Sequence, residues 1–383
     1  MDLAIVIGGN HHNTLGVIRS LGEHNIPVYL ILVGTVDSFV IKSKYINNYI
    51  IVQSRDEVVS CLLDNFLSLS GKIVLFPCND KIAEVLDVNY KLLSQRFILQ
   101  NIKNSPNQIS IAMSKDYMQE VARESGFIVP SYQVLHQDDR LPKNINFPCI
   151  TKTLKSVGGT KSDIIICSNR DELIKAIKPQ NEYLIEDFIE KDYELNVLGC
   201  SLDHGNKVYV PGVIRKIREW PDKRGSSSFS VICSLEEYGI SKDVIDKFIR
   251  SLAYEGLFSI EFVSKDGVNY FLEVNLRNDG NGYISTAMGL NLPYIYYSYS
   301  LNRNTAIEEE LMKYPFYFME DFTDIKHVLH RNIKLTEWIQ CFNKVNCFLC
   351  YNSKDLKPFY CKLKNVILDY CRSLVKKLRW QSI

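Results

Sequence analysis

The hydrophobic residues of the first 107 positions fall into short runs, each followed by a polar or helical segment. The runs LAIVIGG, VYLILV, YIIV and KIVLFP have the length and the aliphatic content of buried parallel strands. Between the first two runs, Leu15, Ile18 and Leu21 recur at helical spacing. Strands that alternate with helices predict a parallel sheet covered on both faces, and therefore an α/β domain over residues 1–107.

Residues 108–305 show the pattern of a second, mixed α/β and α+β domain. Helical spacing over residues 107–126 is followed by three strand-like runs and one helix over residues 147–189. Alternating runs at 193–202 and 207–217, joined by a turn, predict antiparallel strands. A helix over 243–254 precedes a hairpin of LFSIEFV and NYFLEVN. We predict a lid subdomain over about 130–190 within this domain, and a partly helical extension over residues 306–383.

The segment FLEVNLRNDGNG, residues 271–282, carries the strongest chemical signal. Because strand side chains alternate between faces, Glu273, Asn275 and Arg277 share one face. The opposite face presents apolar residues to a core, namely Tyr270, Leu272, Val274 and Leu276. Carboxylate and amide oxygens suit Mg²⁺, and an adjacent guanidinium suits a phosphate. The strand is thus predicted to hold a metal–phosphate complex, which indicates a protein that uses ATP.

A second carboxylate, Glu261, lies on the preceding strand. It shares a face with Glu273 if the residue numbers across the hairpin sum to 534, which places the two directly opposite. The same register puts three apolar residues of the first strand on the core face: Phe258, Ile260 and Phe262. A two-residue Asp266-Gly267 turn gives a sum of 533 and separates the carboxylates. We therefore predict an odd-numbered loop or a bulge in this hairpin.

Composition narrows the class of protein. The chain has 383 residues, 46% hydrophobic and 23% charged, and its formal net charge of +1 provides no field to attract nucleic acid. The N-terminus lacks the basic and apolar regions of a signal peptide, and no apolar run reaches the roughly 18 residues of a membrane span. We expect a cytoplasmic protein. Of its eleven cysteines, Cys341, Cys347 and Cys350 come closest to a cluster, which falls short of a zinc-site or disulfide framework, and the cysteines are predicted to be reduced, buried thiols.

Two features leave alternatives open. Gly8 and Gly9 follow the first strand without the G-x-G-x-x-G spacing of a dinucleotide site, although they can let a small ligand approach. Residues 360–380 predict a helix with one apolar and one basic side. Such a helix either docks on its own domain or contacts an anionic membrane or a partner.

The order of these motifs resembles the ATP-grasp superfamily of carboxylate–amine ligases, as in a stand-alone relative of the carbamoyl phosphate synthase large subunit. The resemblance covers roughly residues 1–300. It rests on a helical lysine, Lys115, on the strand lysine of CITKTLKSVGGTKS, on the acidic segment YLIEDFIEKDYE, and on the E…E-x-N-x-R set that begins at Glu261. It implies an ATP-grasp fold preceded by a Rossmann-like domain.

The resemblance also implies a role for each residue. Lys115 and Lys152 would contact the ATP phosphates, under a loop whose backbone N–H groups come close at Ser156, Gly158 and Gly159. The base and ribose would be held by Glu186, by the backbone of Asp187, Phe188 and Ile189, and by Glu194. The ligands of Mg²⁺ or Mn²⁺ would be Glu261, Glu273 and Asn275, and Arg277 would steady the γ-phosphate.

The implied reaction makes an acyl-phosphate from ATP and a small carboxylate, and an amine then displaces phosphate. The substrate carboxylate is expected to be held by a cation among Arg215, Lys216 and Arg218; the alternative is that these residues are a solvated charge run. We expect Arg215 to be the catalytic one. Only one of Arg215 and Lys216 can point inward if the strand continues. Polar residues near them are expected to line the substrate site or simply to form turns: Ser226–Ser228, Asn278, Asp279 and Asn281.

Other functions remain open at this point. The short KSVGGTKS loop, with two glycines, favours an amino-acid or sugar-acid ligase over bicarbonate chemistry. A kinase on the same fold and a non-catalytic nucleotide-binding protein are the alternatives. The expected partners are a small-molecule carboxylate, an amine and, because many relatives are dimers, a second copy of the chain, but no nucleic acid.

Overall fold

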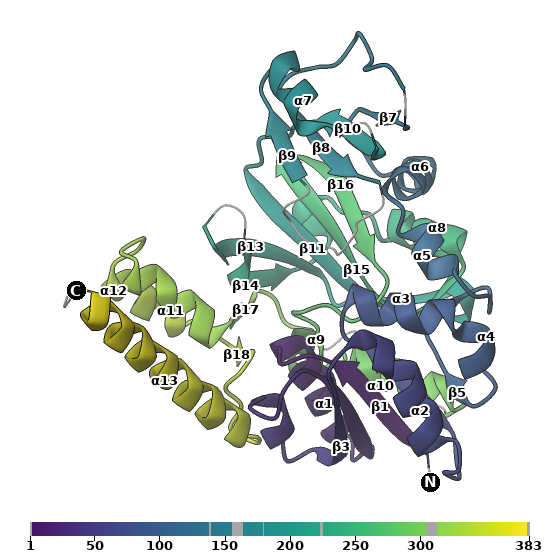
Figure 1. Cartoon of the computed structure of the whole chain (residues 1–383), viewed down its shortest axis with the longest axis vertical. Helices are drawn as coiled ribbons and strands as arrows, with labels where there is room; N and C mark the ends of the chain where they lie inside the picture. Colours follow the sequence, from purple (N-terminus) through teal and green to yellow (C-terminus); the bar gives the residue numbers. More distant parts are fainter. Residues whose placement is uncertain are drawn as a thin grey trace.

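The computed structural model describes residues 2–137, 139–154, 164–178, 180–222, 225–303 and 312–380; within the last helix it describes side chains to Asp369 and that of Arg372. Figure 1 shows the N-terminal domain at one end, the lid at the other and the C-terminal helices along one side. Among the described residues, no helix combines the length and the apolar character needed to cross a bilayer. The ten cysteines described are free, and eight of them are buried.

The N-terminal domain is a parallel sheet with helices on both faces, as expected. Its main elements are β1 (Leu3–Gly8), α1 (His12–Gly22), β2 (Val28–Val33), β3 (Ile46–Val52), α2 (Val58–Phe66), β4 (Ile73–Pro77), α3 (Asp80–Val88), α4 (Tyr90–Leu93) and β5 (Phe97–Ile98). The strand order is β3-β2-β1-β4-β5, and every neighbouring pair is parallel. Successive side chains of β1 pack into hydrophobic cores on opposite faces of the sheet: Val6 packs into one core and Ile7 into the other. The predicted Rossmann-like sheet is therefore confirmed.

A connecting segment leads to the lid. It consists of β6 (Asn101–Ile102), α5 (Gln108–Ala112) and α6 (Lys115–Ser125). The lid contains β7 (Tyr132–Leu135), β8 (Cys149–Thr153), β9 (Ile164–Cys167), α7 (Arg170–Ala176) and β10 (Tyr183–Asp187). Its four strands form an antiparallel sheet in the order β7-β10-β8-β9, and α7 covers one face (Figure 1). Leu135, Leu173 and Ile185 form part of a small core of its own.

The largest sheet lies between the lid and the N-terminal domain. The strands and helices of this part of the chain are β11 (Tyr193–Leu202), β12 (Lys207–Tyr209), β13 (Val213–Trp220), β14 (Ser226–Cys233), α8 (Lys242–Leu252), β15 (Tyr254–Lys265), β16 (Val268–Asn275), α9 (Tyr283–Ala287) and α10 (Leu292–Ser300). The prediction of a single strand over 207–217 is wrong, because the strand is interrupted at Pro211-Gly212. Gly212 has φ +134°, and a Cβ there would clash with the Cys233 carbonyl.

The C-terminal segment is part of the same sheet and is more than a helical extension. It comprises β17 (Phe316–Met319), α11 (Asp321–Leu329), α12 (Leu335–Phe342), β18 (Cys347–Phe348) and α13 (Lys357–Trp380). β17 pairs antiparallel with β14, and β18 pairs parallel with β17. The segment is also tied to the N-terminal domain, since the buried Arg19 contacts Asp355 at 3.1 Å and the Cys350 carbonyl at 2.9 Å.

The β15–β16 hairpin has the register that the two-carboxylate site requires. Its turn is the two-residue Asp266-Gly267, with φ +50° and +77°, and pairing near the turn sums to 533. A bulge between Glu261 and Phe262 leaves Leu272 as the extra residue. Beyond it the sum is 534, and Glu261 lies opposite Glu273, so the predicted bulge is confirmed.

The bulge also corrects the predicted core face of the hairpin. Tyr270 and Leu272 are only partly buried, whereas Phe271 is fully buried opposite Phe262. Its ring lies 5.6 Å from that of Phe127 and 5.5 Å from that of Phe248, measured between centroids. The extra residue therefore gives the core an aromatic anchor at one end of the strand and aligns the acidic face at the other.

Candidate active site

Four side chains project from the same face of the large sheet. Across β11 and β15, Asn196 lies directly opposite Glu261, which in turn lies opposite Glu273 on β16. Asn275, two residues further along β16, donates from Nδ2 to Glu261 Oε1 at 3.4 Å. Two carboxylates and two amides thus stand in adjacent rows, and their oxygens are the hard ligands that Mg²⁺ prefers.

The electrostatics of this face call for a cation. Burial, followed by the charge of Glu273, raises the pKa of Glu261 to about 7, while Lys216 acts in the opposite direction. Ionisation of both carboxyl groups is energetically unfavourable when they lie this close on a partly desolvated surface. A divalent cation would remove that repulsion, so the residues present fit a magnesium ion.

Lys216, and not Arg215, is the strand cation that faces these carboxylates. Arg215 lies opposite Leu195 on the core side of β11, is exposed, and places its guanidinium 4.9 Å from the ring centroid of Tyr193. Lys216 pairs with Glu194, and the charges of Glu261 and Glu194 outweigh its burial and raise its pKa. The assignment of Arg215 to the catalytic set is therefore corrected, since the alternation of side chains allows one residue inward and the structure selects Lys216.

Glu194 forms ion pairs with two lysines. One carboxylate oxygen pairs with Lys191 and the other with Lys216. Lys191 also contacts Glu219 at 2.9 Å, and the second oxygen of Glu219 is buried without a hydrogen-bond partner among the described residues. A ribose hydroxyl at Glu194 would thus compete with an existing ion pair.

Arg277 is held in place by two carboxylates. Its Nε donates to Asp80 Oδ1 at 2.9 Å, and its Nη1 lies 3.6 Å from Asp279 Oδ2. Asp80 is the first residue of α3, and the preceding Asn79 caps that helix by accepting a hydrogen bond from the Ile82 N–H. The N-terminal domain thus positions the arginine that the E-x-N-x-R motif supplies.

The loop that follows this motif joins the domains. Asn278 and Asn13 exchange hydrogen bonds, with Asn13 Nδ2 donating to the Asn278 carbonyl at 2.9 Å. Asp279 accepts from the Asn281 N–H at 2.8 Å and from Ser259 Oγ at 3.2 Å. These contacts support the turn-forming role of the loop, and they also leave Asp279 beside Arg277 at the floor of the site.

The lid and the connecting helix α6 contribute a second group of charges. Lys152 on β8 pairs with Glu186 on β10, and Lys115 Nζ donates to the Thr153 carbonyl at 2.6 Å. Glu186 is buried, and its Oε2 atom has no hydrogen-bond partner among the described residues. A buried, unpartnered acceptor is costly and fits an exocyclic amino group such as that of adenine. The structure therefore brings Lys115, Lys152 and Glu186 together.

Other predicted nucleotide contacts are not available in this form. The N–H groups of Asp187 and Phe188 already donate to the carbonyls of Ser131 and Pro148, at 2.8 and 3.1 Å. Both are therefore corrected as backbone donors to a base, whereas the role of Ile189 stays a prediction. The phosphate-covering positions, Ser156, Gly158 and Gly159, lie outside the described residues.

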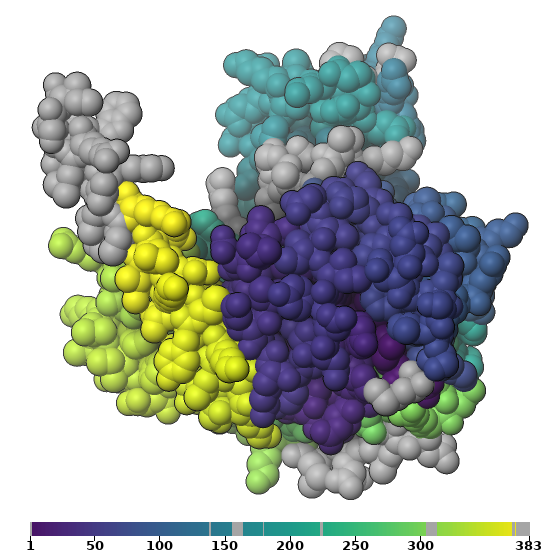
Figure 2. Space-filling model, turned by 60° about the horizontal axis from the view of Figure 1, so that its bottom comes forward, coloured from purple at the N-terminus to yellow at the C-terminus, as the bar shows by residue number. Residues whose placement is uncertain are grey.

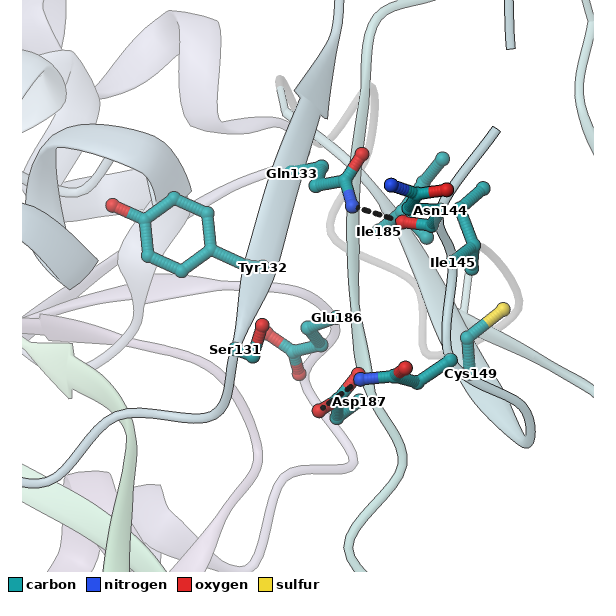
Figure 3. A pocket seen from close by; sticks show the side chains of 10 residues that line it. Ser131, Tyr132, Gln133, Asn144, Ile145, Cys149, Ile185, Glu186 and Asp187 are labelled. Atoms are coloured by element: carbon teal, nitrogen blue, oxygen red, sulfur yellow. Dashed lines mark hydrogen bonds between the residues drawn. The ribbon is translucent and has the colours of Figure 1, made fainter. Parts of the chain in front are cut away.

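A small hollow lies on the lid, against the strand end that carries Glu186 and Asp187. Figure 3 shows Gln133 donating to the Asn144 carbonyl along its wall. Asn146 donates to Asp187 at 3.2 Å. Its volume of about 20 Å³ holds roughly one water molecule. The hollow is too small for a nucleotide, so we do not assign it as the active site.

The second group of expected substrate residues belongs to a different structure. Arg218 makes a two-point contact with Asp324 of α11, at 3.0 and 2.7 Å, and Ser228 donates to the same carboxylate at 2.8 Å. Trp338 of α12 adds a fourth hydrogen bond to it at 3.0 Å. Arg218 and Ser228 therefore hold the C-terminal helices onto the sheet and are corrected as substrate residues.

Sequence reasoning missed Asn196 and Asp80 and underrated Lys216. Asn196 alternates with Glu194 in the predicted strand YELNVLGCSL, which is the signal that places both on one face. Asp80 comes directly after the predicted strand KIVLFP and its short polar end. Only the packing of the two domains shows that Asp80 meets Arg277.

Comparison with known proteins identifies the fold. Residues 120–289 match the family model of the ATP-grasp domain. The carbamoyl phosphate synthase large chain of Methanothrix thermoacetophila is 26% identical over 206 residues, which is 50% of this chain and 19% of that protein. The chain thus spans about a fifth of the length of this curated relative.

Solved structures share the fold. N5-carboxyaminoimidazole synthetase from Staphylococcus aureus aligns with a TM-score of 0.65 and 15% identity, over 88% of this chain and 86% of that one. The biotin carboxylase domain of Hydrogenobacter thermophilus 2-oxoglutarate carboxylase, solved with MgADP and bicarbonate, gives 0.63 and 17%, over 82% and 73%. The fold is therefore ATP-grasp. The match to the family model follows the Rossmann-like domain in the chain, and the ATP-grasp fold expected from the sequence is confirmed.

Proposed function

We propose that this protein is an ATP-dependent ligase that activates a small carboxylate as an acyl-phosphate and joins it to an amine. The observation that carries the proposal is the pairing of Glu261 with Glu273, with Asn275 at the end of the same strand and Arg277 just beyond it. A structural role would not require two facing carboxylates at a solvent-accessible face. A bound Mg²⁺ would be held by Glu261, Glu273 and Asn275 and would reduce the charge of the phosphates.

The residues of the chain divide the remaining work. Lys115 and Lys152 meet the phosphates from the lid side, and Glu186 accepts from the adenine amino group. Arg277, steadied by Asp80, contacts the phosphoryl group as it moves to the substrate carboxylate. The acyl-phosphate then reacts with the amine, and phosphate leaves. Catalysis by this route is positioning and charge stabilisation, and no side-chain nucleophile takes part.

Lys216 is the cation that we assign to the substrate side in place of Arg215. The charge of Glu261 stabilises its protonated form, and its ammonium pairs with Glu194. A substrate carboxylate that replaced one arm of this ion pair would lie beside the phosphoryl group. The matched relatives include ligases that join carbon to nitrogen, which supports the same class of reaction for this chain.

The test is an ADP-release assay on the full chain with Mg-ATP and pooled carboxylates and amines. We expect release that depends on both pools, and a loss of about 100-fold or more in Glu273→Gln, which keeps the shape and removes the charge. Asp266→Asn is the matched control, because Asp266 lies on the same hairpin at its exposed turn and Asn tolerates its φ of +50°.

Three outcomes would overturn the proposal. Full turnover in Glu273→Gln would remove the metal assignment. A stable phosphorylated product formed without an amine would identify a kinase. Binding of Mg-ATP with no phosphate released from any pool would identify a nucleotide-binding protein without catalysis.

A further inference from the structure

The C-terminal part of the chain is strongly basic. Residues 326–383 contain twelve lysines and arginines against three acidic residues, a net charge of +9 in a chain whose total is +1. The preceding 325 residues therefore carry a net charge of −8. Charge separated in this way gives one region of the molecule an attraction for anionic partners that the net charge conceals.

The same region exposes apolar side chains in rows. On α12, Leu335, Ile339 and Phe342 are spaced by one helical turn each and are 54%, 45% and 40% exposed. On α13, Tyr360 and Ile367 lie two turns apart on one face and are 59% and 54% exposed. We call these five residues, together with Tyr351, the C-terminal surface.

Ring contacts connect the two helices. Phe342 lies 4.9 Å from Phe348 between ring centroids, and Phe348 lies 6.0 Å from Tyr351. The series continues through Phe359, 5.5 Å from Tyr351 and 5.7 Å from Tyr360. The exposed rings of α12 and α13 thus belong to one connected surface.

α13 is anchored at its start and exposed further along. Phe359 packs against the main core, Lys362 pairs with Glu320 at 2.6 Å, and Asn365 donates to the Asp37 carbonyl at 3.1 Å. The next three residues, Val366, Ile367 and Leu368, are all exposed. Consecutive helical residues point about 100° apart, so the body of the protein covers none of these directions. Figure 2 shows α13, in yellow, along the outside of the molecule beside the N-terminal domain.

We propose that the C-terminal surface binds the face of an anionic lipid bilayer. Exposed lysines occur between α12 and α13 and on α13, at Lys344, Lys354, Lys357 and Lys364, and the sequence of α13 continues with Arg372, Lys376, Lys377 and Arg379. Lysines attract lipid phosphates, while aliphatic and aromatic side chains enter the boundary between headgroups and acyl chains. Nucleic acid supplies phosphates but no apolar phase for Ile367 or Leu335, so the bilayer fits both halves of the surface.

Vesicle co-sedimentation with the full chain tests the proposal. We use vesicles of phosphatidylcholine alone and vesicles with about 30% phosphatidylglycerol, near physiological salt. We expect binding to the anionic vesicles to be at least about ten-fold tighter than to the neutral ones, and to weaken at about 0.5 M salt as charges are screened. Binding needs no nucleotide, so its outcome is independent of the proposed ligase activity.

Matched variants locate the contact. Ile367→Asp is expected to weaken anionic-vesicle binding about five-fold or more, whereas Ile174→Asp, at a 56% exposed isoleucine of the lid helix α7, leaves it unchanged. Lys364→Glu is compared with Lys91→Glu on α4 in the same way. Thermal melts by circular dichroism confirm that each variant folds.

Several results would overturn the proposal. These are absence of binding to anionic vesicles, equal binding to both vesicle types, or an equal effect of Ile174→Asp and Ile367→Asp. Self-association of the chain that Ile367→Asp abolishes, without vesicle binding, would assign the surface to a second copy of the chain instead.

Discussion

Strand β13 carries two clusters of charge that are built in opposite ways. At Lys216, the last regularly paired residue before a register shift, the strand faces more carboxylates than cations, and burial raises the pKa of Glu261 to about 7. Arg218 lies just past the register shift and pairs with Asp324, which accepts four hydrogen bonds in all. The first cluster has more carboxylates than cations, whereas in the second Arg218 and Asp324 are fully paired. Unbalanced charge therefore marks the site, whereas the number of charged residues does not.

The largest effect is expected from breaking the balanced cluster. Asp324→Ala leaves Arg218 without its partner, and their side chains are 0% and 10% exposed. We expect the free energy of unfolding to fall by about 3–5 kcal/mol, measured by urea denaturation. The control is Asp369→Ala in the exposed Arg372–Asp369 pair, with an expected change within about 0.5 kcal/mol. Equal losses in the two variants would contradict the contrast.

Removing charge from the unbalanced cluster should affect turnover and spare the fold. Glu261→Gln keeps the side-chain shape but removes one of the two facing carboxylates. We expect kcat for ADP release to fall by about 100- to 1000-fold, while urea denaturation shows no loss of stability. A variant with normal turnover, or one that lost both turnover and stability, would argue that the carboxylate pair is structural.

The pH dependence of stability sharpens the same contrast. The pKa of Glu261 in the folded protein, about 7, lies above its ordinary value of 4.5. The folded form therefore holds the proton more tightly, so stability is lost as the pH rises from 4.5 through 7 and the loss is complete above 7. Each unit of pKa corresponds to about 1.4 kcal/mol. Without divalent cations, Glu261→Gln should gain at least about 1.4 kcal/mol over the native chain at about pH 8, and much less at about pH 5.

Urea denaturation of both proteins at these two pH values, with a chelator present, measures this difference. Added Mg²⁺ should reduce the gain at the higher pH, because the cation offsets the repulsion that the glutamine removes. A gain of equal size at both pH values would contradict the assignment of the raised pKa to Glu261.

The smallest effect separates the two neighbouring cations. Lys216→Met should lower kcat/KM by about ten-fold, since it removes the cation beside Glu261, whereas Arg215→Met should change it less than about two-fold. Steady-state kinetics with varied carboxylate substrate measure both. A stronger effect of Arg215→Met would restore the original expectation for that residue.

The register of the central hairpin was predictable because burial leaves little freedom. An acidic face and an apolar face must each be continuous, and a shift of one residue exchanges them. The need for a bulge follows from that demand. Its location at Leu272 does not, since it depends on how Phe271 packs against Phe127 and Phe248.

Contacts between distant parts of the chain were beyond the sequence patterns. Arg218 and Asp324 are 106 residues apart, and Arg277 and Asp80 are 197 apart. Local periodicity shows which residues are charged and which face they share, but not which partner packing brings to them. This is why Arg218 was grouped with the substrate residues and why Asp80 was overlooked.

The way in which the C-terminal segment extends the large sheet has a consequence for aggregation. β14 pairs with β17, and the sheet then ends at β18, which has only two residues. A short final strand offers few free backbone groups to another chain. A fragment that ended after α10 would expose the eight residues of β14 as a long edge, open to pairing with other copies. The C-terminal segment thus protects the sheet from intermolecular strand pairing.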